Sequence, residues 1–110
     1  MTLELDGFLA RLAAWVRQAQ HPVETFAYGS HSEQVADLRL PLSGGAHSVV
    51  VLLHGGFWRS RFTRASTDAL AVDLARRGYA TWNVEYRRVG CGGGIPQTLD
   101  DVHAAVRRLD

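Results

Sequence analysis

The strongest constraint on the fold is one uninterrupted apolar run, Ser48-Val-Val-Val-Leu-Leu53. Three β-branched residues in succession favour a strand, and the missing alternation between apolar and polar side chains indicates a strand buried on both faces. Strands of this kind occupy the middle of parallel sheets that helices cover on both sides. The run therefore predicts an α/β fold in which residues 48–53 form a central strand.

The spacing of apolar residues predicts three helices, over residues 5–19, over 66–77 and from Pro96 onward. Gly78 follows the second helix as a stop signal. No Gly, Asn or Pro follows the third, so it is expected to continue to Asp110. The apolar stripes are Leu5, Phe8, Leu9, Leu12 and Val16 in the first helix, Leu70, Ala71, Leu74 and Ala75 in the second, and Leu99, Val102, Val106 and Leu109 in the third.

Two short runs, residues 23–28 and 34–40, flank the polar segment Gly29 to Glu33 and predict a β-hairpin. Residues 79–86 predict a further strand, and a glycine-rich loop from Arg87 to Ile95 follows it. Hairpin, strand, helix, strand and helix in succession indicate an α/β sheet with parallel central strands and crossover helices. The series looks unfinished, so we expect a helical segment over 1–22 and an incomplete domain over 23–110.

Composition restricts the class of protein but names no partner. With 46% hydrophobic and 21% charged residues, the 110-residue chain has the composition of one soluble globular domain. A net charge of +1 favours neither nucleic acid nor a membrane surface, and no run approaches the roughly 18 apolar residues of a membrane-spanning helix. The chain has no signal-peptide pattern and a lone cysteine, Cys91, so a cytoplasmic location is expected. All twelve basic residues are Arg, which we interpret as the base composition of a GC-rich bacterial genome.

The apolar run ends in His54-Gly55-Gly56-Phe57-Trp58, the segment that carries most chemical information. Two glycines let the backbone turn sharply and approach a ligand without a Cβ in the way. Backbone amides placed in this manner stabilise the negative charge that develops on a carbonyl oxygen during acyl transfer, each typically by ~3 kcal/mol. The loop is therefore suited to an oxyanion hole, the alternative being a turn whose glycines serve packing alone.

This loop resembles the HGGG-type or HGGxW loop of α/β-hydrolases in the esterase, lipase and kynurenine-formamidase-like groups. The similarity covers roughly residues 25–110 and includes Gly78-Tyr79-Ala80, Glu85-Tyr86-Arg87-Arg88 and Leu99-Asp100-Asp101-Val102. The resemblance implies an α/β-hydrolase fold of which this chain is the N-terminal part. It also implies a serine hydrolase that acts on a small-molecule carboxylic ester or amide and needs no cofactor.

The same resemblance assigns roles within the loop. The amides of Gly56 and Phe57 are the expected oxyanion donors, with Gly55 beside them, while His54 and Trp58 support the loop. Phe57 stands where many relatives have a third glycine, which leaves the donor pair open.

The nucleophile that this family uses is missing from the sequence. A Gly-x-Ser-x-Gly elbow, followed along the chain by an acid and a His, is the family pattern, and no serine of this chain fits it. We expect the whole triad downstream of Asp110 and expect the 110-residue chain alone to be inactive. A non-catalytic or truncated binding module is the alternative.

Arginines accompany the loop and the next strand. Arg59, Arg61 and Arg64 could hold a substrate carboxylate, although loop arginines are commonly solvated. Arg87 is expected to pair with Asp100 or Asp101 and so fix the glycine-rich loop against the third helix, which is a structural role.

Other local patterns carry less weight. Gly90 to Gly94 could cradle a phosphate or nucleotide at a helix N-terminus, but G-x-G-x-x-G fails at Ile95 and no Gly-Lys-Ser/Thr follows. Ser30 and His31 are adjacent in a turn and unsuited to triad geometry, and Cys91 has no assigned base. No metal site is expected, because metal-ligand spacing is missing around His21, His47 and His103.

The sheet order implied by the resemblance puts the strand over 48–53 beside the strand over 79–86, with its other edge unpaired in this chain. Long apolar edges pair with other chains. Self-association through this edge is therefore expected.

Overall fold

The computed structural model describes residues 7, 9, 11, 23–42, 47–56, 59 and 61–110. Residues 7, 9 and 11 are helical, and the rest of the helix predicted over residues 5–19 lies outside the described part of the chain. None of the helices described is long and apolar enough to cross a lipid bilayer.

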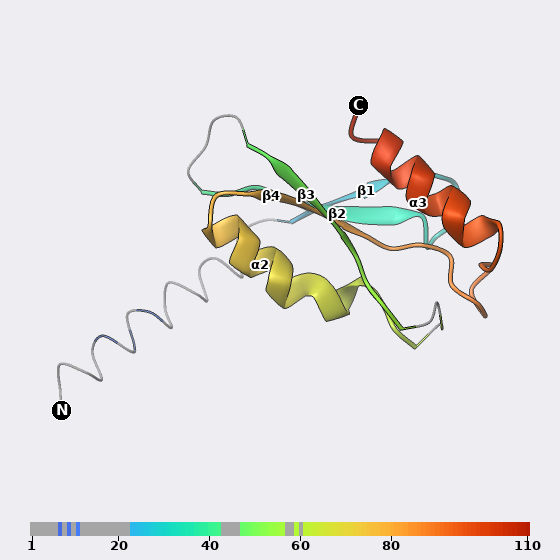
Figure 1. Ribbon diagram of the computed structural model, residues 1–110, viewed down its shortest axis with the longest axis horizontal. Helices are drawn as coiled ribbons and strands as arrows, with labels where there is room; N and C mark the ends of the chain where they lie inside the picture. Colours follow the sequence, from blue (N-terminus) through green and yellow to red (C-terminus); the bar gives the residue numbers. More distant parts are fainter. Residues whose placement is uncertain are drawn as a thin grey trace.

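In the described part of the chain, four strands form one mixed sheet in the order β1-β2-β4-β3 (Figure 1). The strands β1 and β2 make the predicted antiparallel hairpin, in which Phe26 lies opposite Ala36. β2 is antiparallel to β4, whereas β3 and β4 are parallel, as predicted for the central strands. The strand bounds are Glu24–Ala27 for β1, Val35–Arg39 for β2, Val49–Leu53 for β3 and Ala80–Val84 for β4.

Helices cover opposite faces of β4. The 3-10 helix η1 (Arg64–Thr67) and α2 (Asp68–Arg76) connect β3 to β4, and α3 (Gln97–Arg107) follows β4 (Figure 1). The side chain of Asn83 donates to Arg64 O and Asp68 Oδ1, whereas the neighbouring Trp82 donates to Ala105 O in α3. Because successive strand residues point to opposite faces, α2 and α3 lie on the two sides of the sheet. This is the α/β-hydrolase arrangement of hairpin, parallel strands and crossover helix, with a sheet that does not close.

The helices α2 and α3 end by different means. Gly78 terminates α2 with a φ of 98°, and the amides of Gly78 and Tyr79 donate to Ala75 O and Leu74 O, both at 3.1 Å. This is the Schellman arrangement that a left-handed glycine allows. The expectation that α3 continues to Asp110 was wrong, since it ends at Arg107. Short-range bonds such as Asp110 N to Arg107 O, at 3.1 Å, close it without a glycine.

The core lies around β4 and not, as the sequence indicated, around β3. Every residue of β4 is buried, because β4 has a strand on each side and a helix on each face. Val49 and Leu53 of β3 are 46% and 48% exposed, so the prediction of a strand buried on both faces was wrong. Within the described residues β3 pairs with β4 alone, and its position at the end of the sheet leaves these side chains uncovered.

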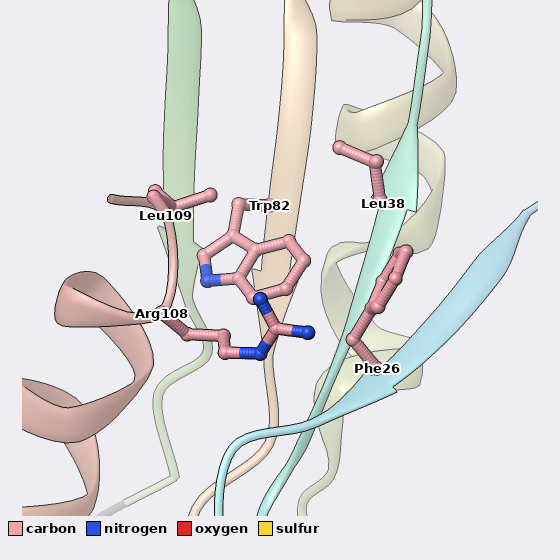
Figure 2. Close-up of a pocket in the computed structure, with 5 residues that line it drawn as sticks. All are labelled: Phe26, Leu38, Trp82, Arg108 and Leu109. Atoms are coloured by element: carbon pink, nitrogen blue, oxygen red, sulfur yellow. The ribbon is translucent and has the colours of Figure 1, made fainter.

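On the α3 side of the sheet, Trp82 is the centre of a small apolar cluster. The core residues Ala36, Trp82, Val84 and Ala105 pack together, with Phe26 and Leu38 against them. A cavity of about 150 Å³ opens beside the indole, and Arg108 lies across it with its guanidinium 5.5 Å from the Phe26 ring centroid (Figure 2).

The buried helix faces differ from the apolar stripes of the sequence. α2 buries Ala71, Val72 and Ala75, while Leu70 is 48% exposed. α3 buries Thr98, Asp101 and Ala105, and its Leu99 is exposed. Polar contacts to β4 and its following segment, described below, therefore set the rotation of α3 more than its apolar stripe does.

The exposed edge of β3 predicts that the chain self-associates. Replacing Val49 by Lys puts a charge on this edge and should raise the monomer fraction, because charged side chains oppose strand pairing between copies. Size-exclusion chromatography with light scattering over a range of concentrations measures the effect. Leu70→Lys is the matched control, since Leu70 is equally exposed but lies on α2. A wild-type chain that stays monomeric throughout would contradict the prediction.

Candidate active site

Three segments meet at the carboxyl ends of the two parallel strands. β3 and β4 end side by side, with Leu53 opposite Val84, and β2 begins beside them, with Ala36 also opposite Val84. The turn before β2, the loop after β3 and the segment after β4 therefore share one edge of the sheet. Ligands of α/β proteins bind at this edge.

The loop after β3 has a backbone that only glycine accommodates at one position. Gly56 has a φ of 119°, and a Cβ built there would lie 2.4 Å from the ring of Phe62. Two turns follow, in which Arg59 N donates to Gly56 O at 3.1 Å and Phe62 N donates to Arg59 O at 3.2 Å. Gly55 needs no such exception, because a Cβ there meets nothing within 4 Å. Phe57 and Trp58 lie outside the described residues, so their roles stay predictions.

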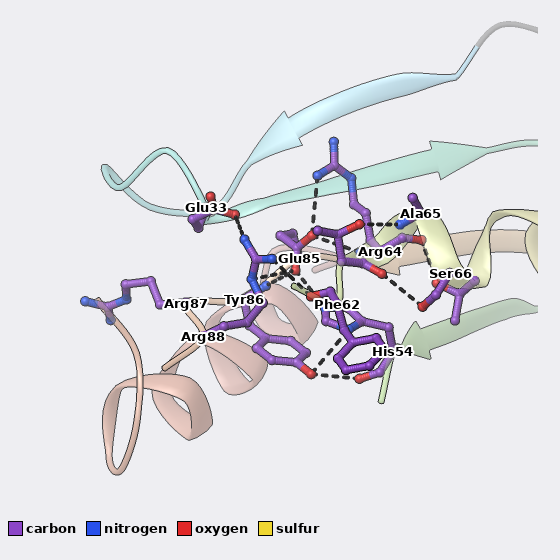
Figure 3. A network of polar contacts seen from close by, with 12 residues as sticks. Glu33, His54, Phe62, Arg64, Ala65, Ser66, Glu85, Tyr86, Arg87 and Arg88 are labelled. Carbon is purple, nitrogen blue, oxygen red and sulfur yellow. Dashed lines mark hydrogen bonds and ion pairs between the residues drawn. The ribbon is translucent and has the colours of Figure 1, made fainter. Parts of the chain in front are cut away.

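His54 opens this loop and is held on both ring nitrogens. It is 4% exposed, its Nε2 lies 2.7 Å from Glu85 Oε1, and its Nδ1 lies 3.0 Å from Gly55 O (Figure 3). The ring stacks on Tyr86 with centroids 4.4 Å apart, and the Tyr86 hydroxyl donates to His54 O at 2.7 Å. Burial and the Glu85 charge raise the pKa of Tyr86, which keeps this hydroxyl a donor. The backbone at the start of the loop is thus fixed by two side chains from the end of β4.

Glu85 is the functional residue that sequence reasoning did not assign. It is 1% exposed, and its second oxygen, Oε2, accepts a hydrogen bond from Arg64 N at 2.9 Å. Two guanidiniums lie nearby, with Arg88 Nε 3.6 Å from Oε1 and Arg64 Nη1 3.8 Å from Oε2. The available signal was the segment Glu85-Tyr86-Arg87-Arg88, which carried the family resemblance without a role for its acid.

The loop arginines differ in what they already bind. Arg64 Nε donates to Asp37 Oδ2 at 2.8 Å, so the structure engages this side chain within the protein instead of leaving it for a substrate carboxylate. Arg61 lies over the Phe62 ring, 4.8 Å from its centroid. Arg59 is exposed and pairs through its backbone with Val89.

Arg87 contacts Asp101, the second of the two acids that the sequence left open. Its Nη2 lies 2.8 Å from Asp101 Oδ1, its own amide donates to Oδ2 at 2.8 Å, and Gln34 Nε2 donates to Oδ1 at 2.9 Å. The Thr98 hydroxyl donates to Arg87 O and accepts from Gly94 N. These contacts tie the glycine-rich loop to α3.

The carboxyl group of Asp101 is held in its charged form. Burial raises its pKa, but the hydrogen bonds from the Arg87 side chain, the Arg87 amide and Gln34 outweigh burial and lower the pKa below its ordinary value. The negative charge is therefore part of the structure at neutral pH.

The geometry of the glycine-rich loop argues against a phosphate cradle. The amides of Cys91 and Gly93 both donate to Arg88 O, at 2.8 and 2.9 Å, and the Gly94 amide is used by Thr98. A Cβ on Gly93 would lie 1.9 Å from Arg87 O, so this glycine is required for close packing. Amides already used within the loop do not serve an anion.

The Ser30-His31 pair belongs to the hairpin turn. His31 Nδ1 accepts from Glu33 N at 3.1 Å, and His31 N donates to Gln34 Oε1 at 2.8 Å. The imidazole is thus part of the turn between β1 and β2.

Gly56 and Gly55 form a matched pair for testing the loop backbone. Gly56→Ala should lower the free energy of unfolding by about 2 kcal/mol, because it combines a left-handed φ with a clash against Phe62. Gly55→Ala should change it by less than about 1 kcal/mol. Urea denaturation followed by circular dichroism measures both, and equal effects would show that the described conformation of Gly56 is wrong.

Asp101→Asn should destabilise the fold in a pH-dependent manner. Because the folded-state pKa of Asp101 is lowered, the charge contributes its full stability above the ordinary pKa of about 3.9 and loses it as the pH falls below that value. We expect a cost of about 2 kcal/mol at pH 7, which shrinks by pH 3. Urea denaturation at several pH values checks this, and a cost that does not change with pH would refute it.

Comparison with known proteins agrees with this geometry. Solved structures that share the fold include a proposed thioesterase from Silicibacter sp. tm1040, with a TM-score of 0.70 at 25% identity over 88% of this chain. A bacterial heroin esterase matches with a TM-score of 0.67 at 26% identity over 83%, and the bifunctional GH43-CE protein of Bacteroides eggerthii with 0.64 at 26% identity over 74%.

This chain spans 39%, 30% and 12% of the lengths of the thioesterase, heroin esterase and GH43-CE structures, respectively. Comparison with curated proteins gives no match. The BD-FAE family model matches residues 36–110, which include β2 except its first residue, the loop after β3 and the whole Glu85 to Asp101 region. The chain therefore belongs to the BD-FAE family of esterase-like α/β-hydrolases.

Proposed function

We propose that the protein formed with this chain is a serine hydrolase of small carboxylic esters or amides, and that the loop His54 to Trp58 is its oxyanion hole. The observation that carries the proposal is the backbone at Gly56. A left-handed glycine follows a parallel strand, its Cβ position is filled by Phe62, and the preceding His54 is fixed by buried partners. A rigid, Cβ-free backbone at this edge suits amides that must face a reacting carbonyl oxygen.

In this mechanism a serine outside the chain attacks the carbonyl carbon while a histidine accepts its proton. The carbonyl oxygen becomes negatively charged and is stabilised by the amides of Gly56 and Phe57, with Gly55 beside them. The same histidine then protonates the leaving alcohol or amine, and water releases the acid from the serine by the reverse sequence. The route needs no cofactor.

The similar structures include an esterase and a proposed thioesterase, which support an activated acyl group as the substrate. Arg59 and Arg61 are exposed beside the loop, and we propose them as contacts for a substrate carboxylate. Arg64 is not proposed for this role, because Asp37 and Glu85 hold it.

A non-catalytic binding module is the second proposal for the chain by itself. It rests on the sequence, in which no serine lies in a Gly-x-Ser-x-Gly elbow. Under this proposal the loop would bind an acyl compound without turning it over.

Turnover of p-nitrophenyl acetate and of an acyl thioester separates these proposals. The 110-residue chain should give no saturable rate above a serine-free protein control. The whole protein encoded by its gene should give saturable hydrolysis and covalent labelling of one serine by a fluorophosphonate. Saturable turnover by the chain alone would place a nucleophile within residues 1–110, and an inert whole protein would leave only the binding module.

A further inference from the structure

One carboxylate holds both ends of the loop after β3. Glu85 Oε1 lies 2.7 Å from His54 Nε2 at the start of the loop, and Glu85 Oε2 accepts from Arg64 N, 2.9 Å away, at its end. Each carboxylate oxygen of Glu85 thus contacts one end of the loop (Figure 3). The loop from His54 to Arg64 is thus closed on a single side chain.

The residues that follow Glu85 reinforce the same two ends. Tyr86 donates its hydroxyl to His54 O at 2.7 Å and stacks its ring on the imidazole. Arg88 Nη1 donates to Phe62 O at 3.0 Å, two residues before Arg64. The segment after β4 therefore contacts the loop after β3 at residues 54, 62 and 64.

These contacts influence the backbone of Gly56 through Phe62. The Phe62 ring lies where a Cβ of Gly56 would be, 2.4 Å away, so the place of residue 62 shapes the backbone at residue 56. Arg88 holds the Phe62 carbonyl and Glu85 holds the amide of Arg64, the first residue of η1. The backbone proposed to form the oxyanion hole is thus held in place by the segment after β4.

Burial makes the arrangement stiff. Glu85, His54 and Arg88 are 1%, 4% and 4% exposed. A buried carboxylate is tolerated only when donors surround it, and losing one donor leaves an uncompensated charge away from water. Displacing either end of the loop therefore costs more than breaking a hydrogen bond at the surface.

We infer that Glu85 is a positioning residue, which touches no substrate and fixes the two ends of the loop after β3 through His54 and Arg64. The catalytic consequence rests on the proposed function, whereas the clamp itself does not. Stabilisation of a developing oxyanion depends on donors that are in place before the reaction.

Hydrogen exchange on the 110-residue chain tests the clamp. Glu85→Gln keeps the shape of the side chain but offers one acceptor oxygen in place of two, so one of its two donors faces an amide NH₂. The Arg64 amide should exchange about tenfold faster. Asp101→Asn is the matched control, because Asp101 is also a buried acid at this edge but binds the Arg87 amide. This variant should accelerate hydrogen exchange at the Arg87 amide and leave exchange at the Arg64 amide unchanged.

Tyr86→Phe is the second variant and decides the matter if Glu85→Gln does not fold. It keeps the ring stacked on His54 and removes only the hydroxyl that donates to His54 O. Exchange at Arg64 should again accelerate, although less than in Glu85→Gln. Wild-type exchange rates at the Arg64 amide in the folded variants would overturn the clamp.

Steady-state kinetics of the whole protein test the consequence for catalysis. Glu85→Gln should lower kcat for p-nitrophenyl acetate about 10²-fold, because a displaced donor loses transition-state stabilisation, and KM should stay within about twofold. Asp101→Asn should leave kcat within about twofold below its unfolding temperature. A wild-type protein without esterase activity would contradict only the proposed function. An unchanged kcat in Glu85→Gln would contradict only the positioning role of Glu85.

Discussion

The contact between Glu85 and His54 is the interaction on which the edge of this sheet depends. A carboxylate that is only 1% exposed requires donors, and Glu85 takes them from the loop after β3 and from η1. Tyr28 of the hairpin turn adds a hydrogen bond to the Glu85 carbonyl. Segments that are far apart in the sequence are thereby bound to one residue. Apolar packing assembles the strands, but this polar centre decides how their ends lie.

A second polar centre, at Asp101, does the same for α3. The helix turns buried Thr98, Asp101 and Ala105 toward the sheet, and two of these three make polar contacts to Arg87. Leu99 stays exposed as a result. Glu85 thus fixes the ends of the loop after β3 against the segment after β4, and Asp101 fixes that segment against α3.

Local signals in the sequence were sufficient for the elements and insufficient for their burial. The hairpin, the parallel strands and the stop at Gly78 follow from short apolar runs and turn residues, and the structure confirms them. The apolar run of β3 could not by itself reveal that β3 lies at the end of the described sheet, because its neighbours come from elsewhere in the chain; only the family resemblance indicated the unpaired edge. The loop glycines were visible as a motif, but the role of Glu85 depends on a contact across 31 residues, and nothing local marks an acid as buried. The α3 stripe failed for the same reason, since the Arg87–Asp101 ion pair and the Thr98 hydrogen bond to Arg87 O overrode its apolar face.

The register of β3 and β4 also determines which residues lie opposite each other just after the two strands end. Leu53 lies opposite Val84, so the next pair in the same alignment is His54 and Glu85. The packing of Val, Leu and Trp side chains that sets this register therefore also determines which residue lies opposite the buried Glu85. A shift by one residue would bring Gly55 there and point the imidazole to the other face. Apolar packing and the placement of His54 against Glu85 are thus set by one alignment, so a change in the first would move the second.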